Sequence, residues 1–227
     1  MAATFKALSA LLTYPTEELQ RAAGEIRTAI ETEGLVDRHA RAALAPFLDE
    51  LAAADLFDLQ ERYVDLFDKS RRLSLHLFEH VHGESRDRGQ AMVDLAALYE
   101  RGGLVLSANE LPDFLPLFLE YLSTRPLQEA RGVLSDTLHI LSALQARLAE
   151  RGSPYAAVLG AIRAAAGDRK TASDAEPAQP DDLAALDAAW EETAVVFGPG
   201  DATDGCSVDR LRIRMRAGQR DVRQAAV

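Results

Sequence analysis

The 227-residue sequence has few β-branched aliphatic residues, a single cysteine and no long uncharged run. Its 12 Val and 5 Ile stand against 40 Ala and 33 Leu, and Ala and Leu favour helices whereas Val and Ile favour strands. The longest uncharged run, Gly152 to Ile162, has 11 residues, fewer than the about 20 apolar residues that a membrane-spanning helix needs. Cys206 alone can form neither an internal disulfide nor a multi-thiolate metal site. The sequence therefore predicts an all-α protein that does not insert into a membrane.

Positive charge is scarce over most of the chain. The net charge is −11, but six Arg and two Asp from Asp209 onward give that segment +4, so the preceding 208 residues carry −15. Such an acidic body repels nucleic-acid phosphates and favours a basic partner. Residues 1–6 lack the basic region and the apolar stretch of a secretory signal. We therefore expect a cytoplasmic protein that binds no nucleic acid.

Periodicity and capping residues divide the chain into helices. The predicted helices cover about 4–12, 16–34, 37–54, 55–68, 88–101, 110–123, 127–150 and 153–167, and a loop with short helical turns covers 69–86. Thr16, Asp55 and Asn109 are predicted N-caps, and Pro46 and Pro116 are expected to kink or distort their helices. The expected organisation is a single-domain helical bundle over residues 1–166, a linker over 167–181, and a short helix with a mobile Arg-rich tail over 182–227.

A heptad of leucines marks the longest predicted helix. Leu127, Leu134, Leu141 and Leu148 recur every seven residues. This spacing fits either a leucine zipper or the inner seam of a helical bundle. We prefer the seam, because one long helix among many short ones rarely forms a free coiled coil.

The densest polar cluster lies between His76 and Gly89. His76 and His80 are four residues apart, so on a helix both would lie on one face, where with Glu79 or Glu84 they could bind a metal. Ordinary hydrogen-bonded histidines or a partner contact are preferred, because neither cysteine nor a second pair of distant ligands accompanies them. The sequence also lacks a phosphate-binding Gly loop with its Lys, G-x-S-x-G and H-E-x-x-H. We expect no enzyme, no metal and no cofactor.

Two further segments combine carboxylates with apolar residues. Residues 49–68 hold seven carboxylates beside an apolar helix face that includes Tyr63 and Phe67. They form either a solvated helix face or the acidic rim of an apolar groove for a basic amphipathic helix. Residues 110–116 hold two prolines and two carboxylates. They form either a kinked core helix with an acidic first turn or a binding site, and the residues alone favour neither.

Three motifs in these segments resemble the cytoplasmic chaperones of molybdoenzymes. Residues 63–67, YVDLF, are similar to the Y-x-x-L-F element of that superfamily, and residues 110–113, ELPD, to its E-x-x-D element. Phe114 stands where the superfamily often has His, which fits the nitrate reductase branch better than the trimethylamine-oxide or dimethylsulfoxide branches. The run 77–89, with its H-x-H-G-E-S-x-D-R-G text, is the most specific match and resembles the NarJ family of nitrate reductase assembly chaperones. The likeness covers roughly residues 5–148.

The resemblance implies a helical chaperone of respiratory nitrate reductase. Such a protein binds the N-terminal segment of the immature catalytic α subunit, and with it the apo α–β complex. Binding would hold the apoprotein open for insertion of the molybdenum cofactor and iron–sulfur clusters, and would delay membrane docking. Two alternatives stay open: an export or assembly chaperone for another molybdoenzyme, and a metal-dependent enzyme that uses the His cluster.

The predicted partner-binding residues come from the three motifs and the carboxylates near them. They are Tyr63, Phe67, Asp68, His76, Phe78, Glu79, His80, His82, Gly83, Asp87, Arg88, Gly89, Glu110, Pro112, Asp113, Phe114 and Glu120. Phe67 could equally be core, because it is an apolar residue at helical spacing. If Asp113 lies exposed in the first turn of its helix, Asp113→Asn should cost less than about 1 kcal/mol of stability. The tail after Gly167 is expected to be dispensable for client binding.

Overall fold

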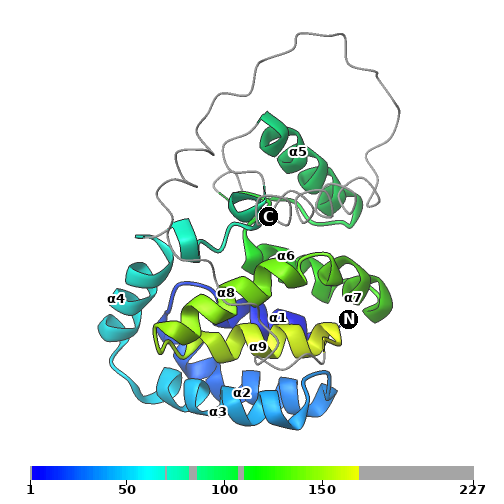
Figure 1. Ribbon diagram of the computed structural model, residues 1–227. Coiled ribbons are helices and arrows are strands. Elements are labelled where there is room, and N and C mark those ends of the chain that lie inside the picture. The colour runs from blue at the N-terminus through cyan, green and yellow to red at the C-terminus, as the bar shows by residue number, and fades with distance from the viewer. Residues whose placement is uncertain (1, 70, 82–85, 107–109, 169–227) are drawn as a thin grey trace, which may run out of the picture.

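The computed structural model of the chain describes residues 2–69, 71–81, 86–106 and 110–168. Over these ranges it contains α-helices and two short 3-10 helices but no strand, which confirms the all-α prediction (Figure 1). The elements are α1 (Ala3–Leu11), α2 (Glu17–Glu33), α3 (Arg38–Ala53), α4 (Leu56–Phe67), η1 (Arg71–Leu73), η2 (Leu77–His80), α5 (Arg86–Arg101), α6 (Leu115–Ser123), α7 (Leu127–Ser135), α8 (Leu138–Glu150) and α9 (Tyr155–Ala166). None of the described helices is long and apolar enough to cross a membrane.

The first four helices begin where the sequence predicts. The Thr16 hydroxyl accepts a hydrogen bond from Leu19 N and the Asp55 carboxylate accepts one from Phe57 N, so both predicted N-caps are confirmed. α2 ends at Gly34, whose φ of 68° is the left-handed conformation that glycine adopts at low cost. α3 continues through Pro46 as one helix, so the predicted interruption does not break it.

Helices α1 and α9 form the centre of the bundle. α1 packs against α2, α6 and α9, while α9 packs against α1, α3, α7 and α8. In Figure 1 the two central helices lie between α2 and α3 at the bottom and α6 above. α9 suits this place because its small and aliphatic residues, from Val158 to Ala165, bury all but a narrow stripe of the helix. Burial of apolar area of this kind supplies most of the driving force for folding.

The predicted long helix over 127–150 is two helices. α7 ends at Ser135 and α8 begins at Leu138. Between them Thr137 is fully buried, and its hydroxyl donates to Leu134 O at 2.8 Å. The heptad leucines from Leu134 onward are buried in the common core, which fits the bundle seam and not a zipper. The leucine heptad therefore predicts correctly which side of the segment is buried. It does not reveal the break between α7 and α8, where the Thr137 hydrogen bond lies.

One predicted helix start is wrong, and another is displaced by two residues. α6 begins at Leu115 instead of Glu110, because residues 111–114 form a turn and Phe114 makes a β-bridge with His76. Pro116 therefore lies in the first turn of α6, where its missing N–H leaves no hydrogen bond unmade, and it does not distort the helix. α5 begins at Arg86, two residues before the predicted start. Asn109, the predicted cap of α6, lies outside the described residues.

The described fold continues to Asp168, just past the predicted boundary at residue 166. The Arg163 guanidinium is buried and donates to the Asp168 carboxylate at 2.9 and 2.7 Å. Its remaining nitrogen donates to Gln145 Oε1 at 2.8 Å, which ties the end of α9 to α8. The predicted linker from 169 onward, the short helix and the Arg-rich tail lie outside the described residues.

Candidate functional site

Two of the three motif segments meet in one place. His76 and Phe114 form an antiparallel β-bridge, in which Leu77 N donates to Asp113 O at 3.0 Å. Leu115 N donates to Leu75 O at 2.8 Å and closes the other side of the bridge. We call residues 74–80 and 111–115 together the Asp113 junction.

The Asp113 carboxylate organises this junction. It is fully buried, and its Oδ2 accepts a hydrogen bond from Phe78 N at 3.1 Å. Its Oδ1 lies 3.1 Å from His76 Nδ1. An ionised carboxylate only accepts, so His76 Nδ1 carries the hydrogen and donates it. The carboxylate thus joins two residues at the start of η2 to the segment before α6. The prediction of an exposed Asp113 in a helical first turn is wrong, because residues 111–114 form a turn that ends in the bridge to His76, and the Asp113 side chain is buried there.

His76 and His80 have different partners. His80 Nε2 lies 2.8 Å from Ser74 O, and a carbonyl only accepts, so Nε2 carries the hydrogen. Burial lowers the pKa of His80, which keeps its ring neutral at neutral pH. η2 begins only after His76, so the two rings do not share a helix face as predicted. Among the residues that the structure describes, no group of three or more His, Cys, Asp or Glu is placed to hold a metal ion. His82 and Glu84 lie outside that part.

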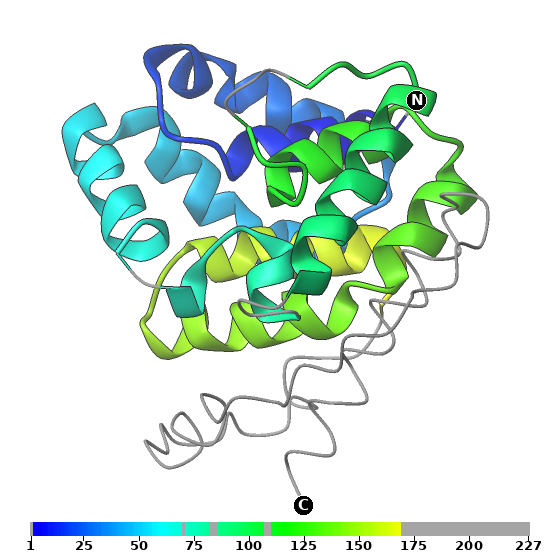
Figure 2. The ribbon, with the colours of Figure 1, turned by 90° about the horizontal axis from the view of Figure 1, so that it is seen from above.

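The junction also attaches α5 to the bundle. The Tyr99 hydroxyl is buried and donates to Pro112 O at 2.7 Å, and the Tyr99 ring packs on Tyr121 of α6 at 4.9 Å between centroids. Burial raises the pKa of Tyr99, so the hydroxyl stays protonated as a donor. At the other end of α5, Arg88 pairs with Glu79 at 3.4 Å. Seen from above, α5 lies across the upper surface of the molecule (Figure 2).

The third motif lies elsewhere and belongs to an aromatic cluster. Phe67 and Tyr63 of α4 pack on Tyr155 of α9 with ring centroids 5.0 and 6.2 Å apart, and Phe47 of α3 packs on Tyr155 at 4.9 Å. The Tyr63 hydroxyl donates to Leu12 O at 3.0 Å. Burial raises the pKa of Tyr155 to about 12, as expected for a phenol inside a core. Tyr63 and Phe67 are therefore core residues that join α4 to the bundle.

The predicted partner-binding residues divide by exposure. The buried residues are Tyr63, Phe67, Phe78, Pro112 and Asp113. The half-buried residues are His76, Glu79, His80, Arg88, Phe114 and Glu120. The exposed residues are Asp68, Asp87, Gly89 and Glu110. His82 and Gly83 lie outside the described residues. Sequence reasoning missed Ser74 and Tyr99. The Ser74 backbone oxygen accepts a hydrogen bond from His80, and the buried Tyr99 hydroxyl donates one to Pro112 O. Neither is part of a motif, and only the apolar spacing around Tyr99 indicated that it is buried.

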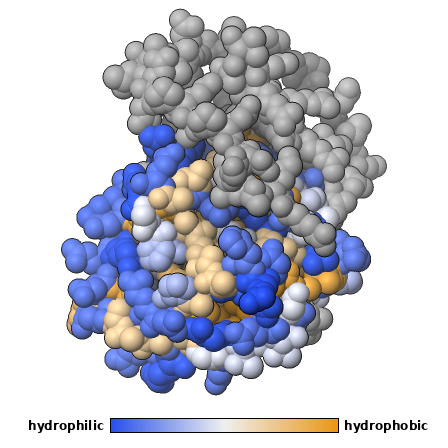
Figure 3. All heavy atoms as spheres, turned by 60° about the horizontal axis from the view of Figure 1, so that its bottom comes forward, coloured by the Kyte–Doolittle hydropathy of each residue, from blue (hydrophilic) through white to orange (hydrophobic). Residues whose placement is uncertain are grey.

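Large apolar side chains are exposed near the junction. Val93 on α5 and Val105 and Leu111 in the segment after it are exposed, Val105 to 91%. On the lower face of the bundle, apolar residues lie in groups between hydrophilic ones (Figure 3). Exposed apolar surface of this kind is available for contact with a partner protein.

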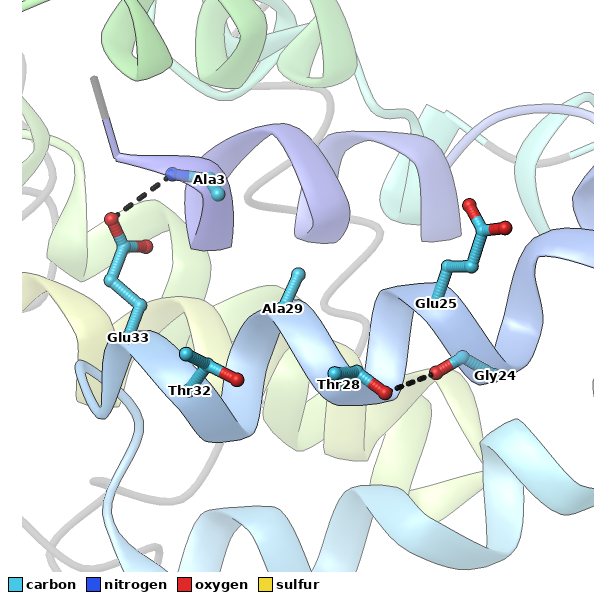
Figure 4. Close-up of a pocket in the computed structure, with 7 residues that line it drawn as sticks. All are labelled: Ala3, Gly24, Glu25, Thr28, Ala29, Thr32 and Glu33. Atoms are coloured by element: carbon cyan, nitrogen blue, oxygen red, sulfur yellow. Dashed lines mark hydrogen bonds between the residues drawn. The ribbon is translucent and has the colours of Figure 1, made fainter.

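A separate groove of about 640 Å³ lies between α1 and α2. It is lined by Ala3, Gly24, Glu25, Thr28, Ala29, Thr32 and Glu33 (Figure 4). The Glu33 carboxylate accepts hydrogen bonds from Ala3 N at 3.1 Å and Thr4 N at 2.6 Å, so it caps the start of α1. None of the predicted site residues lines this groove, and Glu33 already has a structural role.

The fold and the junction define a class of protein: an all-α bundle in which buried motif residues hold loops and a peripheral helix, with exposed apolar residues on that helix and after it. The chain belongs to the nitrate reductase delta subunit family, whose sequence model matches residues 33–160. It is 45% identical over 214 residues to the nitrate reductase molybdenum cofactor assembly chaperone NarJ of Escherichia coli (strain K12), covering 92% of this chain and 89% of that protein.

Two further relatives have similar names. The probable nitrate reductase molybdenum cofactor assembly chaperone NarW of Escherichia coli (strain K12) is 40% identical over 222 residues, covering 96% of this chain and 93% of NarW. The probable NarJ chaperone of Bacillus subtilis (strain 168) is 34% identical over 162 residues, covering 71% of this chain and 87% of that protein. The resemblance seen in the three motifs is thus confirmed over most of the chain.

Proposed function

We propose that the protein is the assembly chaperone of a respiratory nitrate reductase. In this role it binds the N-terminal segment of the immature catalytic α subunit, alone or in the apo α–β complex, and supports molybdenum cofactor insertion before membrane docking. The observation that carries the proposal is the 45% identity, over 92% of the chain, to a protein named as such a chaperone. The protein acts in the cytoplasm as a binding protein, without catalysis and without a cofactor of its own.

The client surface is proposed to lie on α5 and the segment that leads to the junction. Val93, Val105 and Leu111 supply exposed apolar contacts, and Glu110 supplies an exposed carboxylate beside Leu111. Apolar anchors with a carboxylate nearby fit an amphipathic helix that carries basic residues. Two buried residues act indirectly, because Asp113 of the motif and Tyr99 of α5 fix the backbone on which the exposed residues stand.

Titration calorimetry with the N-terminal peptide of the α subunit tests the proposal. Saturable binding is expected, and an absence of heat at high micromolar peptide would refute it. V105S/L111S removes two apolar anchors, each worth about 1 kcal/mol, so affinity should fall about 30-fold. The matched control is F57S, which removes an exposed apolar residue on α4 and should leave affinity unchanged. Equal losses in both variants would contradict the proposed surface.

A peptide from the N-terminus of another molybdoenzyme separates the two chaperone functions. Stronger binding of that peptide would indicate a different client. In cells, V105S/L111S should lower nitrate reductase activity at unchanged chaperone level, whereas F57S should not.

A further inference from the structure

Helix α4 has a solvent-facing side that no described element covers. Its other side buries Leu59, Tyr63, Leu66 and Phe67. The outer side presents Phe57, which is 78% exposed, together with the exposed carboxylates Asp58, Glu61, Asp65 and Asp68. α4 lies at one edge of the molecule (Figure 1). This side of α4 therefore offers a partner one aromatic ring together with several negative charges.

A groove of about 330 Å³ runs along this side of α4. It is lined by Asp58, Glu61, Arg62, Asp65, Leu66, Arg151 and Ser153, so it separates α4 from the turn between α8 and α9. Of its two cations, Arg62 is paired with Glu50 of α3, and Arg151 is exposed. Asp65 is paired with Lys69 on the surface, and an exposed pair of this kind contributes little. The groove therefore holds an excess of negative charge beside an apolar residue.

The other exposed carboxylates of the bundle offer less. Glu17 and Glu18 share Arg21, and Asp37 caps the start of α3. The outer side of α4 combines exposed carboxylates, a groove and an exposed aromatic ring, and these features fit an Arg-rich peptide with apolar residues.

We propose that residues 209–227 of this same chain bind the groove side of α4. This segment has six Arg and two Asp, and Arg210, Arg212, Arg214 and Arg216 alternate with Leu211, Ile213 and Met215. Extended, these four arginines would span about 20 Å, since alternate residues are about 6.6 Å apart. The carboxylates from Asp58 to Asp68 span about 15 Å of helix, at about 1.5 Å per residue. Charge and spacing are thus complementary.

The segment is long enough to reach this surface. α9 begins at Tyr155, whose ring is 5.0 Å from that of Phe67 on α4. Twelve residues of α9 carry the chain about 18 Å away. The 40 residues from 169 to 208 would span about 35 Å at coil dimensions, which covers the return to α4. The proposal concerns contacts within this chain and does not depend on the proposed client.

A spin label on Cys206 tests the proposal in the full chain. Cys206 is the only cysteine and lies three residues before the segment, so a nitroxide attached to it needs no cysteine replacement. Amide NMR signals of α4 should lose intensity relative to the reduced label at about 50 mM salt. They should recover at about 0.5 M salt, where the Debye length falls to about 4 Å.

Two variants with equal loss of charge test whether the segment binds the α4 carboxylates specifically or responds only to the overall negative charge of the protein. D58N/E61Q/D65N should abolish the broadening on α4, whereas the control E25Q/E31Q/E129Q removes equal charge on α2 and α7 and should preserve it. R210Q/R212Q/R214Q/R216Q should abolish it as well. Broadening elsewhere, no broadening, or insensitivity to salt would each overturn the proposal. So would equal broadening in a mixture of labelled unenriched chain with unlabelled ¹⁵N chain, because the segment would then bind a second copy.

Discussion

Replacing Asp113 by Asn tests whether the junction depends on a buried carboxylate. Asp113 accepts from Phe78 N and from His76 Nδ1, each at 3.1 Å. Asn keeps one oxygen and replaces the other by an NH₂ donor. If its oxygen still faces Phe78 N, the NH₂ group faces His76 Nδ1, and His76 must move its hydrogen to Nε2 to accept.

The expected cost follows from the loss of charge. Hydrogen bonds to charged groups contribute about 1.5–3 kcal/mol and neutral ones about 0.5–1.5, so two weakened bonds cost about 2–3 kcal/mol. Asp113→Ala removes both acceptors and should cost about 3–6 kcal/mol. At about 2–4 °C per kcal/mol for a chain of this size, the Tm should fall by about 4–12 °C for Asn and about 6–24 °C for Ala. Both costs exceed the loss of less than about 1 kcal/mol in stability that is expected for an exposed Asp113 in a helical first turn.

Thermal unfolding of both variants gives the measurement, with Glu110→Gln as the matched control. Glu110 is an exposed carboxylate in the same segment, and its replacement should change stability by at most about 0.5 kcal/mol. A double-mutant cycle with His76→Ala isolates the pair, and coupling is expected because the two side chains are in contact. A Tm for Asp113→Asn within 1 °C of wild type, or equal losses for Asn and Ala, would refute this account. Unchanged peptide affinity below the Tm would show that Asp113 stabilises the fold but neither contacts the client nor positions the client surface.

Three further predictions follow from burial and pairing. Phe67→Ala should cost about 3–5 kcal/mol, whereas Phe57→Ala on the same helix should stay within about 0.5, as measured by urea unfolding. Because burial lowers the pKa of His80, the unfolded state binds the extra proton, so the free energy of unfolding should fall as pH decreases below about 6.5; His80→Gln should flatten this slope, and an unchanged slope would contradict it. A chain that ends at Asp168 should keep its Tm and its affinity for the α-subunit peptide, whereas one that ends at Ala166 should melt lower because the buried Arg163 loses its carboxylate; equal Tm values would contradict the role of that pair.

The parts of the fold that depend on local chemistry could be predicted from the sequence. Thr16 and Asp55 cap helices because their side chains accept hydrogen bonds from N–H groups two or three residues on, which is a sequence-local event. The all-α class likewise follows from Ala and Leu content. Leu134 and Leu141 were placed in an inner seam correctly, since periodicity reports burial.

The parts that depend on distant residues could not. The partner of Asp113 is 35 residues earlier in the chain, at Phe78, and no local pattern reveals that pairing. Acidic residues before an apolar run indicate a helical first turn, and here the tertiary bridge to His76 prevailed over that local preference. The break at Thr137 between α7 and α8 could not be predicted either, because the leucine heptad continues across it and indicates one uninterrupted helix.

The Asp113 junction also shapes how the molecule opens locally. It joins residues 75–78 to residues 113–115, and α5 lies in the closed loop between them. Tyr99 holds α5 partly to Pro112, which is inside the same loop. α5 can therefore detach as a unit while the ends of the loop stay pinned, so its amides should exchange with solvent through a sub-global opening. The bundle would then keep its register while the proposed client surface changes shape.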